Sequence, residues 1–378
     1  MTTATSSGPD TGAPTFTARD LRLFGLCAVA TAAAAATHWV SSGSVVPFVM
    51  SAAALALLAS LVGHAVDALG DRLGAGATGV VQSALGNLPE LFVCVFALRA
   101  GLYDVVRAAL VGSVLANVLL VLGMAFVVGG IKHGTQTFAA GRARTIALLL
   151  LLSVCAWLIP SLTYALHTPA RDHEYALSVV TAVMLLVLFG LSLPASVARD
   201  DDPHAREDVT EQEAADGAAA QVQHVSAWPL ALALGVLGAA GLGSAFVSDW
   251  FVSALEPAMH AVHISDAFAG LVVVAIAGNA VENVVGIQLA ARNQSDYALS
   301  IILQSPLQIA LVLAPVLVLI APLVGASFTL VLSPLLIVAL VMTAGIAWLV
   351  VQDGESTWLE GATLIVLYLL IATAFWWG

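Results

Sequence analysis

The sequence predicts an all-α polytopic membrane protein with eleven transmembrane helices: one N-terminal helix followed by two inverted-topology five-helix repeats. Of its 378 residues, 60% are hydrophobic and 10% are charged, and the mean hydropathy is +0.98. Soluble domains carry about 25% charged residues. Long apolar stretches recur along the chain, and the pattern Gly-Asn-x-x-Glu occurs inside two of them, at 86–90 and 278–282. These observations predict a membrane protein with an internal repeat.

Eleven apolar stretches are long enough to cross a bilayer as an α-helix, which needs about 20 residues. They lie near 21–40, 46–69, 77–99, 105–129, 144–163, 174–197, 228–248, 267–290, 297–323, 327–351 and 358–377. Residues 1–18 are polar and rich in Thr, Ser, Gly and Pro, so we expect a disordered tail before the first transmembrane helix at 19–42. No charged segment leads into a short cleavable apolar one, so we expect this helix to stay in the bilayer.

One long polar segment, 199–226, separates the first repeat (43–198) from the second (227–378). It holds much of the acidic excess behind the net charge of −12. Orientation depends on Lys and Arg, which are enriched on the cytoplasmic side. With the N-terminus inside, nine of the twelve Lys and Arg residues face the cytoplasm, and only Arg99, Arg107 and Arg171 face out. We therefore expect the N-terminus inside, the C-terminus outside, and an acidic cytoplasmic linker that is either a solvated tether or a calcium sensor.

The repeat extends beyond the motif. An offset of 192 residues, from Asn87 to Asn279, also aligns Glu90 with Glu282 and Ser113 with Ser305 without a gap. Each repeat has five helices, an odd number, so the second enters the membrane from the opposite side. Inverted repeats of this kind occur in secondary transporters, whose sites lie near the midplane where broken helices meet. The glycines Gly86 and Gly278 are suited to such breaks.

Polar residues within these apolar stretches form the candidate cation site. A carboxylate near the bilayer centre costs about 2.5–3.5 kcal/mol on insertion scales, so the paired Glu90 and Glu282 predict a functional site. We expect cation ligands at Gly86, Asn87, Glu90, Ser113, Asn117, Gly278, Asn279, Glu282, Ser305 and Gln308. Among them, only the two glutamates are predicted to act as charged metal ligands.

Carboxylates, amides, hydroxyls and backbone carbonyls form an all-oxygen set, which suits a hard cation such as Ca²⁺ with its 6–8 oxygen ligands. A buried carboxylate is either protonated or bound to a cation. Protons and the cation therefore exclude each other from the same carboxylates, and this exclusive occupancy is itself an exchange mechanism. Asp67 and Asp249 precede the two motifs in their respective repeats and are, together with the glutamates, the predicted proton-coupling residues. The three cysteines have no CxxC spacing, so neither a disulfide framework nor a zinc site is expected.

At these residues the chain resembles the cation/proton exchanger family of the calcium/cation antiporter superfamily. That family's hallmark is a repeated Gly-Asn-Ala-x-Glu, matched here at Gly86–Glu90 and Gly278–Glu282. Gly112-Ser113, the acidic linker and the segment 129–134 after the fourth helix are also similar. The resemblance implies eleven helices, Ca²⁺/H⁺ antiport and the paired glutamates as the calcium site. The chain departs from the pattern at Leu88-Pro89, Asp67, Asp249, Asn283 and Gln304, which leaves ion selectivity open.

The sequence thus predicts a transporter, not an enzyme, that exchanges Ca²⁺ for H⁺ by alternating access in a bacterial cytoplasmic membrane. Ca²⁺ and H⁺ are its expected substrates and the lipid bilayer its partner, with no resident cofactor and no nucleic acid. The alternatives are Na⁺ or K⁺ exchange for protons, and Na⁺/Ca²⁺ exchange. An intramembrane aspartyl protease is a remote one, because Asp67 and Asp249 lack the Gly-x-Gly-Asp context. The sequence leaves the oligomeric state open, a homo-oligomer included.

Overall fold

The computed structural model describes residues 18–40, 45–73, 85–200 and 228–377, and of residues 18–19, 70–73, 193–200 and 280–283 only the backbone. Almost all of the predicted tail and linker, at 1–18 and 199–226, lies outside the described residues. The side chain of Glu282 also lies outside them, although its backbone is part of a helix.

Among the described residues, eight helical spans are long and apolar enough to cross a membrane. The helices that form them are α1 (Ala18–Val40), α2 (Val45–Leu73), α5–η1–α6 (Tyr103–Leu115, Ala116–Val121, Leu122–His133), α7 (Ala140–Ala165), η2–α8 (Pro169–His173, Glu174–Asp200), α10 (Leu230–Val262), α14–η4–α15–η5 (Ser295–Gln308, Ile309–Leu313, Ala314–Ile320, Ala321–Val324) and α17 (Trp358–Trp376). The chain is therefore a largely helical integral membrane protein, as predicted.

The other three predicted stretches also carry helix, but in shorter pieces. The stretch 77–99 contains α4 (Leu88–Arg99), which begins inside the first motif. The stretch 267–290 is divided into α11 (Asp266–Phe268), η3 (Ala269–Val274), α12 (Ala275–Gly278) and α13 (Ala280–Ala290). The stretch 327–351 begins with non-helical backbone and continues as α16 (Pro334–Val350), and its first helical residue is a proline, which is favoured at that position. The count of eleven membrane crossings stays a prediction.

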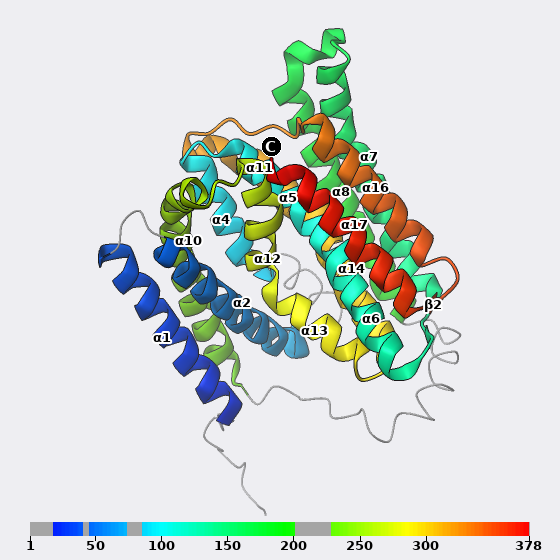
Figure 1. The fold of residues 1–378 in the computed structure, drawn as a ribbon, viewed down its shortest axis with the longest axis horizontal. Helices are drawn as coiled ribbons and strands as arrows, with labels where there is room; N and C mark the ends of the chain where they lie inside the picture. The colour runs from blue at the N-terminus through cyan, green and yellow to red at the C-terminus, as the bar shows by residue number, and fades with distance from the viewer. Residues whose placement is uncertain (1–17, 41–44, 74–84, 201–227, 378) are drawn as a thin grey trace, which may run out of the picture.

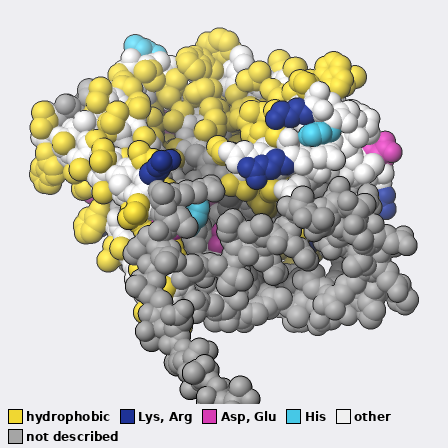
Figure 2. Space-filling view, turned by 90° about the horizontal axis from the view of Figure 1, so that it is seen from below, with side chains coloured by type: hydrophobic (Ala, Val, Ile, Leu, Met, Phe, Trp, Pro, Cys, Tyr) yellow, Lys and Arg dark blue, Asp and Glu magenta, His cyan; other side chains and the backbone are white. Residues whose placement is uncertain are grey.

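The span α5–η1–α6 forms the centre of the molecule and is the most buried of the eight. On one side of it lie α1, α2 and α10, and on the other lie α7, α16 and α17 (Figure 1). Hydrophobic side chains cover much of the described surface in Figure 2, and those exposed on α1, α8 and α10 are suited to face lipid.

Two close helix contacts join the first half of the chain to the second. A Cβ on Gly112 of α5 would lie 2.2 Å from the backbone oxygen of Leu271 in η3. A Cβ on Gly361 of α17 would lie 2.4 Å from the backbone oxygen of Gly123 in α6. Small residues allow backbones to approach this closely, as is common between membrane helices. The glycines therefore fix how the two halves fit together.

Three loops are tied together at one end of the bundle. Strands β1 (Gln136–Thr137) and β2 (Glu355–Ser356) pair antiparallel and join the loop after α6 to the loop after α16. The buried Gln136 side chain donates from Nε2 to the carbonyl of Ala290 at 3.1 Å and to Oδ1 of Asn293 at 2.9 Å. The carbonyl of Ala290, at the end of α13, also accepts from the backbone N–H of Asn293 at 3.1 Å, so Gln136 adds a second donor there. The loops after α6, α13 and α16 thus lie on the same side of the bundle.

Candidate functional site

The two copies of the motif have the same local backbone. Asn87 (φ −91°, ψ 18°) directly precedes α4, and Asn279 (φ −106°, ψ 12°) directly precedes α13. Each asparagine therefore lies at a break in its membrane segment, with a helix starting at the next residue. Pro89 falls in the first turn of α4, where its missing N–H removes no hydrogen bond within the helix. Gly86 belongs to the turn before α4 and is half-buried.

Glu90 lies in the first turn of α4 with 2% of its surface exposed. The hydroxyl of Ser113 in α5 donates a hydrogen bond to its Oε1. A Cβ built on Gly278 would lie 3.6 Å from Cγ of Glu90, so the carboxylate packs against the second copy of the motif. The two motifs, 192 residues apart in sequence, therefore meet at the first glutamate.

Asn279 connects this carboxylate to the second half of the chain. Its Nδ2 donates to Oγ of Ser113 at 3.0 Å, and its Oδ1 accepts a hydrogen bond from Oγ of Ser305 at 3.2 Å. Ser113 and Ser305 are the residues that the offset of 192 aligns, and both are buried. The network therefore uses corresponding residues of the two halves.

Two further amides extend the network. Nδ2 of Asn87 donates to Oε1 of Gln308 at 3.3 Å. Nδ2 of Asn117 donates to the backbone oxygen of Ser113 at 2.9 Å and lies 3.5 Å from Oγ of Ser305. Oδ1 of Asn117 is buried and accepts no hydrogen bond from the described residues. It is thus an oxygen available to a ligand.

The structure brings most of the predicted cation ligands together. One connected group contains Asn87, Glu90, Ser113, Asn117, Gly278, Asn279, Ser305 and Gln308. Glu282 belongs to the first turn of α13, immediately after Asn279, and its side chain lies outside the described residues. Asp67 on α2 and Asp249 on α10 are both exposed. Their proton role stays a prediction.

The carboxylate of Glu90 accepts from a hydroxyl and is connected through it to the amide groups of the network. Among the side chains that the structure describes, no three His, Cys, Asp or Glu residues lie close enough together to hold a metal ion. A cation bound here would therefore depend on amide, hydroxyl and backbone oxygens as well as on carboxylates. Such ligands suit Ca²⁺ and other hard cations, not the transition metals that prefer sulfur or imidazole.

Three π-helical segments near the site were not predicted from the sequence. Segment η1 contains Asn117, η4 directly follows Gln308, and η3 contains Leu271, against which Gly112 packs. π-helical turns inside α-helices are rare and occur frequently at functional sites. Hydropathy does not reveal them, because they change the hydrogen-bond register but not the apolar composition. The 192-residue offset gives one signal, since η1 and η4 fall at nearly corresponding positions.

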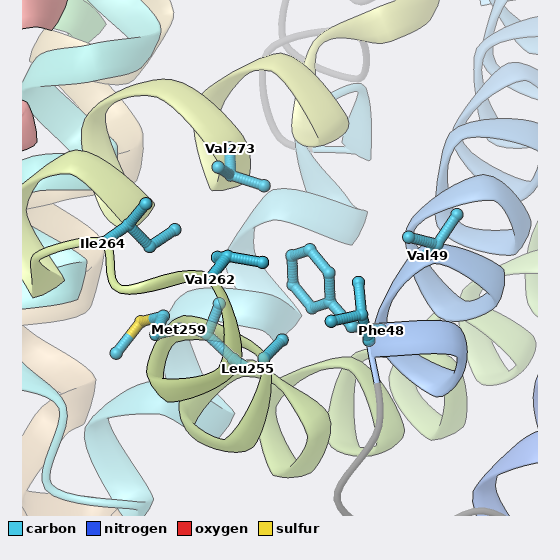
Figure 3. Close-up of a pocket in the computed structure, with 9 residues that line it drawn as sticks. Phe48, Val49, Leu255, Met259, Val262, Ile264 and Val273 are labelled. Carbon is cyan, nitrogen blue, oxygen red and sulfur yellow. The ribbon is translucent and has the colours of Figure 1, made fainter.

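A separate cavity of about 130 Å³ lies between α2, α10 and η3 (Figure 3). Its wall includes Phe48 from α2, Leu255 and Met259 from α10, and Val273 from η3. All nine lining residues are apolar. Since a cation needs polar ligands, this cavity is not the cation site.

Comparison with known proteins agrees with this geometry. A family model described as "Sodium/calcium exchanger protein" matches residues 43–197 and 232–377. The chain belongs to the sodium/calcium exchanger protein family. The two matched segments of this exchanger contain the first and the second motif respectively, and both halves of the hydrogen-bonded network lie within them.

Individual relatives of this exchanger cover nearly the whole chain. It is 32% identical over 353 residues to the "Ca(2+)/H(+) antiporter" of Synechocystis sp., covering 90% of this chain and 93% of that one. It is 32% identical over 340 residues to the "Ca(2+)/H(+) antiporter ChaA" of Bacillus subtilis, covering 89% and 93%. The solved structure of native YfkE has a TM-score of 0.77 at 30% identity and covers 94% of this chain and 99% of its own.

Ser113→Ala is expected to weaken cation binding while the exchanger still folds. The substitution removes the hydroxyl that donates to Glu90 and accepts from Asn279, and it leaves a cavity smaller than a methyl group. We expect the KM for the exchanged cation to rise about tenfold, the effect of losing one hydrogen bond to a charged group. Initial rates in proteoliposomes measure this. Ser153→Ala is the control, because Ser153 is equally buried but bonds only to the backbone of its own helix; equal KM values in the two variants would argue against the site.

Proposed function

We propose that this protein exchanges Ca²⁺ for H⁺ across a bacterial cytoplasmic membrane by alternating access. The observation that carries the proposal is the burial of Glu90 at the contact between the two motifs, within a network of oxygen-bearing side chains from both halves. The near full-length relatives of Synechocystis and Bacillus subtilis, both Ca²⁺/H⁺ antiporters by name, support the same substrates.

In the proposed mechanism, the glutamates hold either the cation or protons. Ionised Glu90 and Glu282 together would balance the charge of one divalent ion, and without that ion each would be stabilised by protonation. Ser113 holds the carboxylate of Glu90 by donating to Oε1. The hydroxyl of Ser113 also accepts a hydrogen bond from Asn279. Replacing the cation by a proton at Glu90 in the first motif would therefore affect Asn279 in the second.

The remaining ligands are proposed from their positions around Glu90. Asn87, Asn117, Asn279, Ser305 and Gln308 offer side-chain oxygens, and Gly86 and Gly278 offer backbone carbonyls at the two helix breaks. Two of these oxygens already accept hydrogen bonds within the network, Oε1 of Gln308 from Nδ2 of Asn87 and Oδ1 of Asn279 from Oγ of Ser305, so cation binding would replace those bonds. Ca²⁺ is the proposed transported substrate, and no resident cofactor is proposed.

We propose eleven crossings arranged as one N-terminal helix and two inverted repeats, with the N-terminus in the cytoplasm. The repeat is supported by matching helix breaks at Asn87 and Asn279 and by the nearly matching π-segments η1 and η4. The orientation is supported by the loops after α6, α13 and α16, which lie on the same side of the bundle, with basic residues in or beside the first two. Basic residues Lys132, Arg142 and Arg144 flank the first of them, and Arg292 lies in the second.

Transport in proteoliposomes with an imposed proton gradient, acidic inside, tests the function, because Ca²⁺ that enters must be exchanged for protons that leave. Adding Ca²⁺ outside is expected to dissipate the gradient and move ⁴⁵Ca²⁺ inward, whereas addition of Mg²⁺ serves as the cation control. A series with Na⁺ and K⁺ distinguishes monovalent cation/proton exchange, and a Na⁺ gradient without a proton gradient distinguishes Na⁺/Ca²⁺ exchange. If none of Ca²⁺, Na⁺ and K⁺ dissipates the proton gradient, the antiporter proposal is wrong.

Asp67→Asn and Asp249→Asn are expected to shift the pH dependence of exchange without abolishing it. Both residues are exposed on helices that pack against each other, and we propose that they receive or release protons on the way to the glutamates. Exchange rates between pH 6 and 9 measure the effect. Asp353→Asn, a change in the exposed loop before β2, is the matched control. A pH profile in both variants identical to that of the control would contradict the proton role.

A further inference from the structure

The π-segment η4 directly follows the part of α14 that carries Ser305 and Gln308. In a π-segment each N–H bonds to the carbonyl five residues back, so one extra residue is accommodated within the helix. An extra residue rotates the side chains of the preceding helical residues by about 100° around the helix axis, relative to the helix that follows. The location of η4 therefore decides which way Ser305 and Gln308 face.

Within η4, the backbone carbonyl of Ala310 loses both of its helical donors. An α-helix would supply the N–H of Ala314, but that N–H donates to the carbonyl of Ile309 instead. A π-helix would supply the N–H of residue 315, which is Pro315 and has none. A buried carbonyl without a donor is costly, particularly in a membrane where water cannot replace the bond.

Trp157 of α7 supplies the missing donor. Its indole Nε1 lies 3.2 Å from the carbonyl oxygen of Ala310, and only 1% of the residue is exposed. The corresponding π-segment in the first half of the chain, η1, does not need a side-chain donor. The residue that the 192-residue offset aligns with Pro315 is Gly123, which has a backbone N–H. Proline in one half and glycine in the other thus explain why a tryptophan is required on one side only.

We propose that Trp157 is a positioning residue for cation exchange, because its indole N–H holds the π-segment at residues 309–313 and thereby directs Ser305 and Gln308 into the site. Trp157 itself touches neither Glu90 nor the asparagines through any hydrogen bond described in the structure. It acts through the register of η4. The inference rests on the proposed function, since it assigns a role toward the same cation site.

Trp157→Phe keeps an aromatic ring in place but removes the N–H. We expect the KM for the exchanged cation to rise about fivefold, the effect of one lost hydrogen bond, with Vmax within about twofold of wild type. Pro315→Ala in the same chain restores a backbone N–H to the Ala310 carbonyl. The double variant is therefore expected to return to within about twofold of the wild-type KM. A merely structural tryptophan would not be rescued by restoring one backbone donor elsewhere.

Trp228→Phe is the matched control, because Trp228 is also buried but stacks on Phe24 of α1, away from η4. Its KM is expected to equal that of wild type. An unchanged KM for Trp157→Phe, or a double variant that stays impaired, overturns the inference. If Trp157→Phe cannot be purified, the double variant decides: normal KM supports the role of Trp157, and a raised KM or failure to fold overturns it.

The same preparations separate this inference from the proposed function. The cation series on the wild-type protein identifies the exchanged ion, and every KM refers to that ion. Wild-type Ca²⁺/H⁺ exchange with an unchanged Trp157→Phe variant means that only the positioning role fails. Hydrogen–deuterium exchange of the 309–314 amides is a readout that does not depend on transport. We expect faster exchange in Trp157→Phe and wild-type rates in the double variant, and the absence of that difference counts against Trp157.

Discussion

Glu90→Gln is expected to abolish cation-driven proton movement, with a decrease in rate of at least about a hundredfold, while the protein still inserts and folds. Glutamine has nearly the shape of glutamate, and its carbonyl oxygen can accept the same hydrogen bond from Ser113. It cannot alternate between an ionised and a protonated form, so it can neither balance the cation's charge nor release a proton. Binding is lost together with turnover, because the charge that attracts the cation is absent.

Proteoliposome transport and ⁴⁵Ca²⁺ binding measure the loss, and elution as a single species in detergent checks the fold. Glu282→Gln is expected to behave in the same way, since the repeat places Glu282 at the matching position after Asn279. Glu256→Gln on α10 is the matched control, because its exposed carboxylate lies outside the network. Near-normal exchange in either Glu90→Gln or Glu282→Gln would show that the site is elsewhere.

Gly112→Ala is expected to prevent α5 from packing on η3, and so to destabilise the whole exchanger. The added Cβ would lie 2.2 Å from the oxygen and 2.5 Å from the Cα of Leu271. Both are backbone atoms, so no side-chain rotation relieves the overlap. Overpacking of this kind typically costs about 1–3 kcal/mol, and here the two helices must separate by more than small adjustments allow. Because Ser113 is the next residue, separation also breaks its bond with Asn279.

The measurements are the yield of monodisperse protein, its Tm, and the exchange rate. We expect a clear decrease in all three for Gly112→Ala. Gly235→Ala on α10 is the control, since a Cβ there meets nothing within 4 Å and alanine favours helix. A stable, active Gly112→Ala protein would mean that α5 and η3 are not held as closely as the contact implies.

The sequence was sufficient to predict the membrane class and most of the candidate site. A buried carboxylate in an apolar stretch is rare enough to identify Glu90, and its duplication identified the asparagines and serines around it. These residues meet in the structure, even though they come from four separate membrane segments. Polar residues inside a membrane must satisfy one another, so their positions in the sequence already limit where they lie in the fold.

What the sequence did not predict depends on backbone hydrogen bonding. Hydropathy measures the length of a stretch but not its interruptions, so the non-helical segment before Pro334 was read as part of a continuous helix. The π-segments were missed for the same reason. The break at Asn279 was expected, because Gly278 precedes it. Trp157 was missed because its partner is a carbonyl, which every residue has, and only the loss of the N–H at Pro315 makes that carbonyl special.

The close contacts of Gly112 with Leu271 and of Gly123 with Gly361 have a consequence for the integrity of the molecule. Each contact joins a helix of the first half to a helix of the second, so each half supplies part of the surface on which the other packs. The halves resemble the subunits of an obligate dimer that have been joined into one chain, and the stability of each is inseparable from the presence of the other.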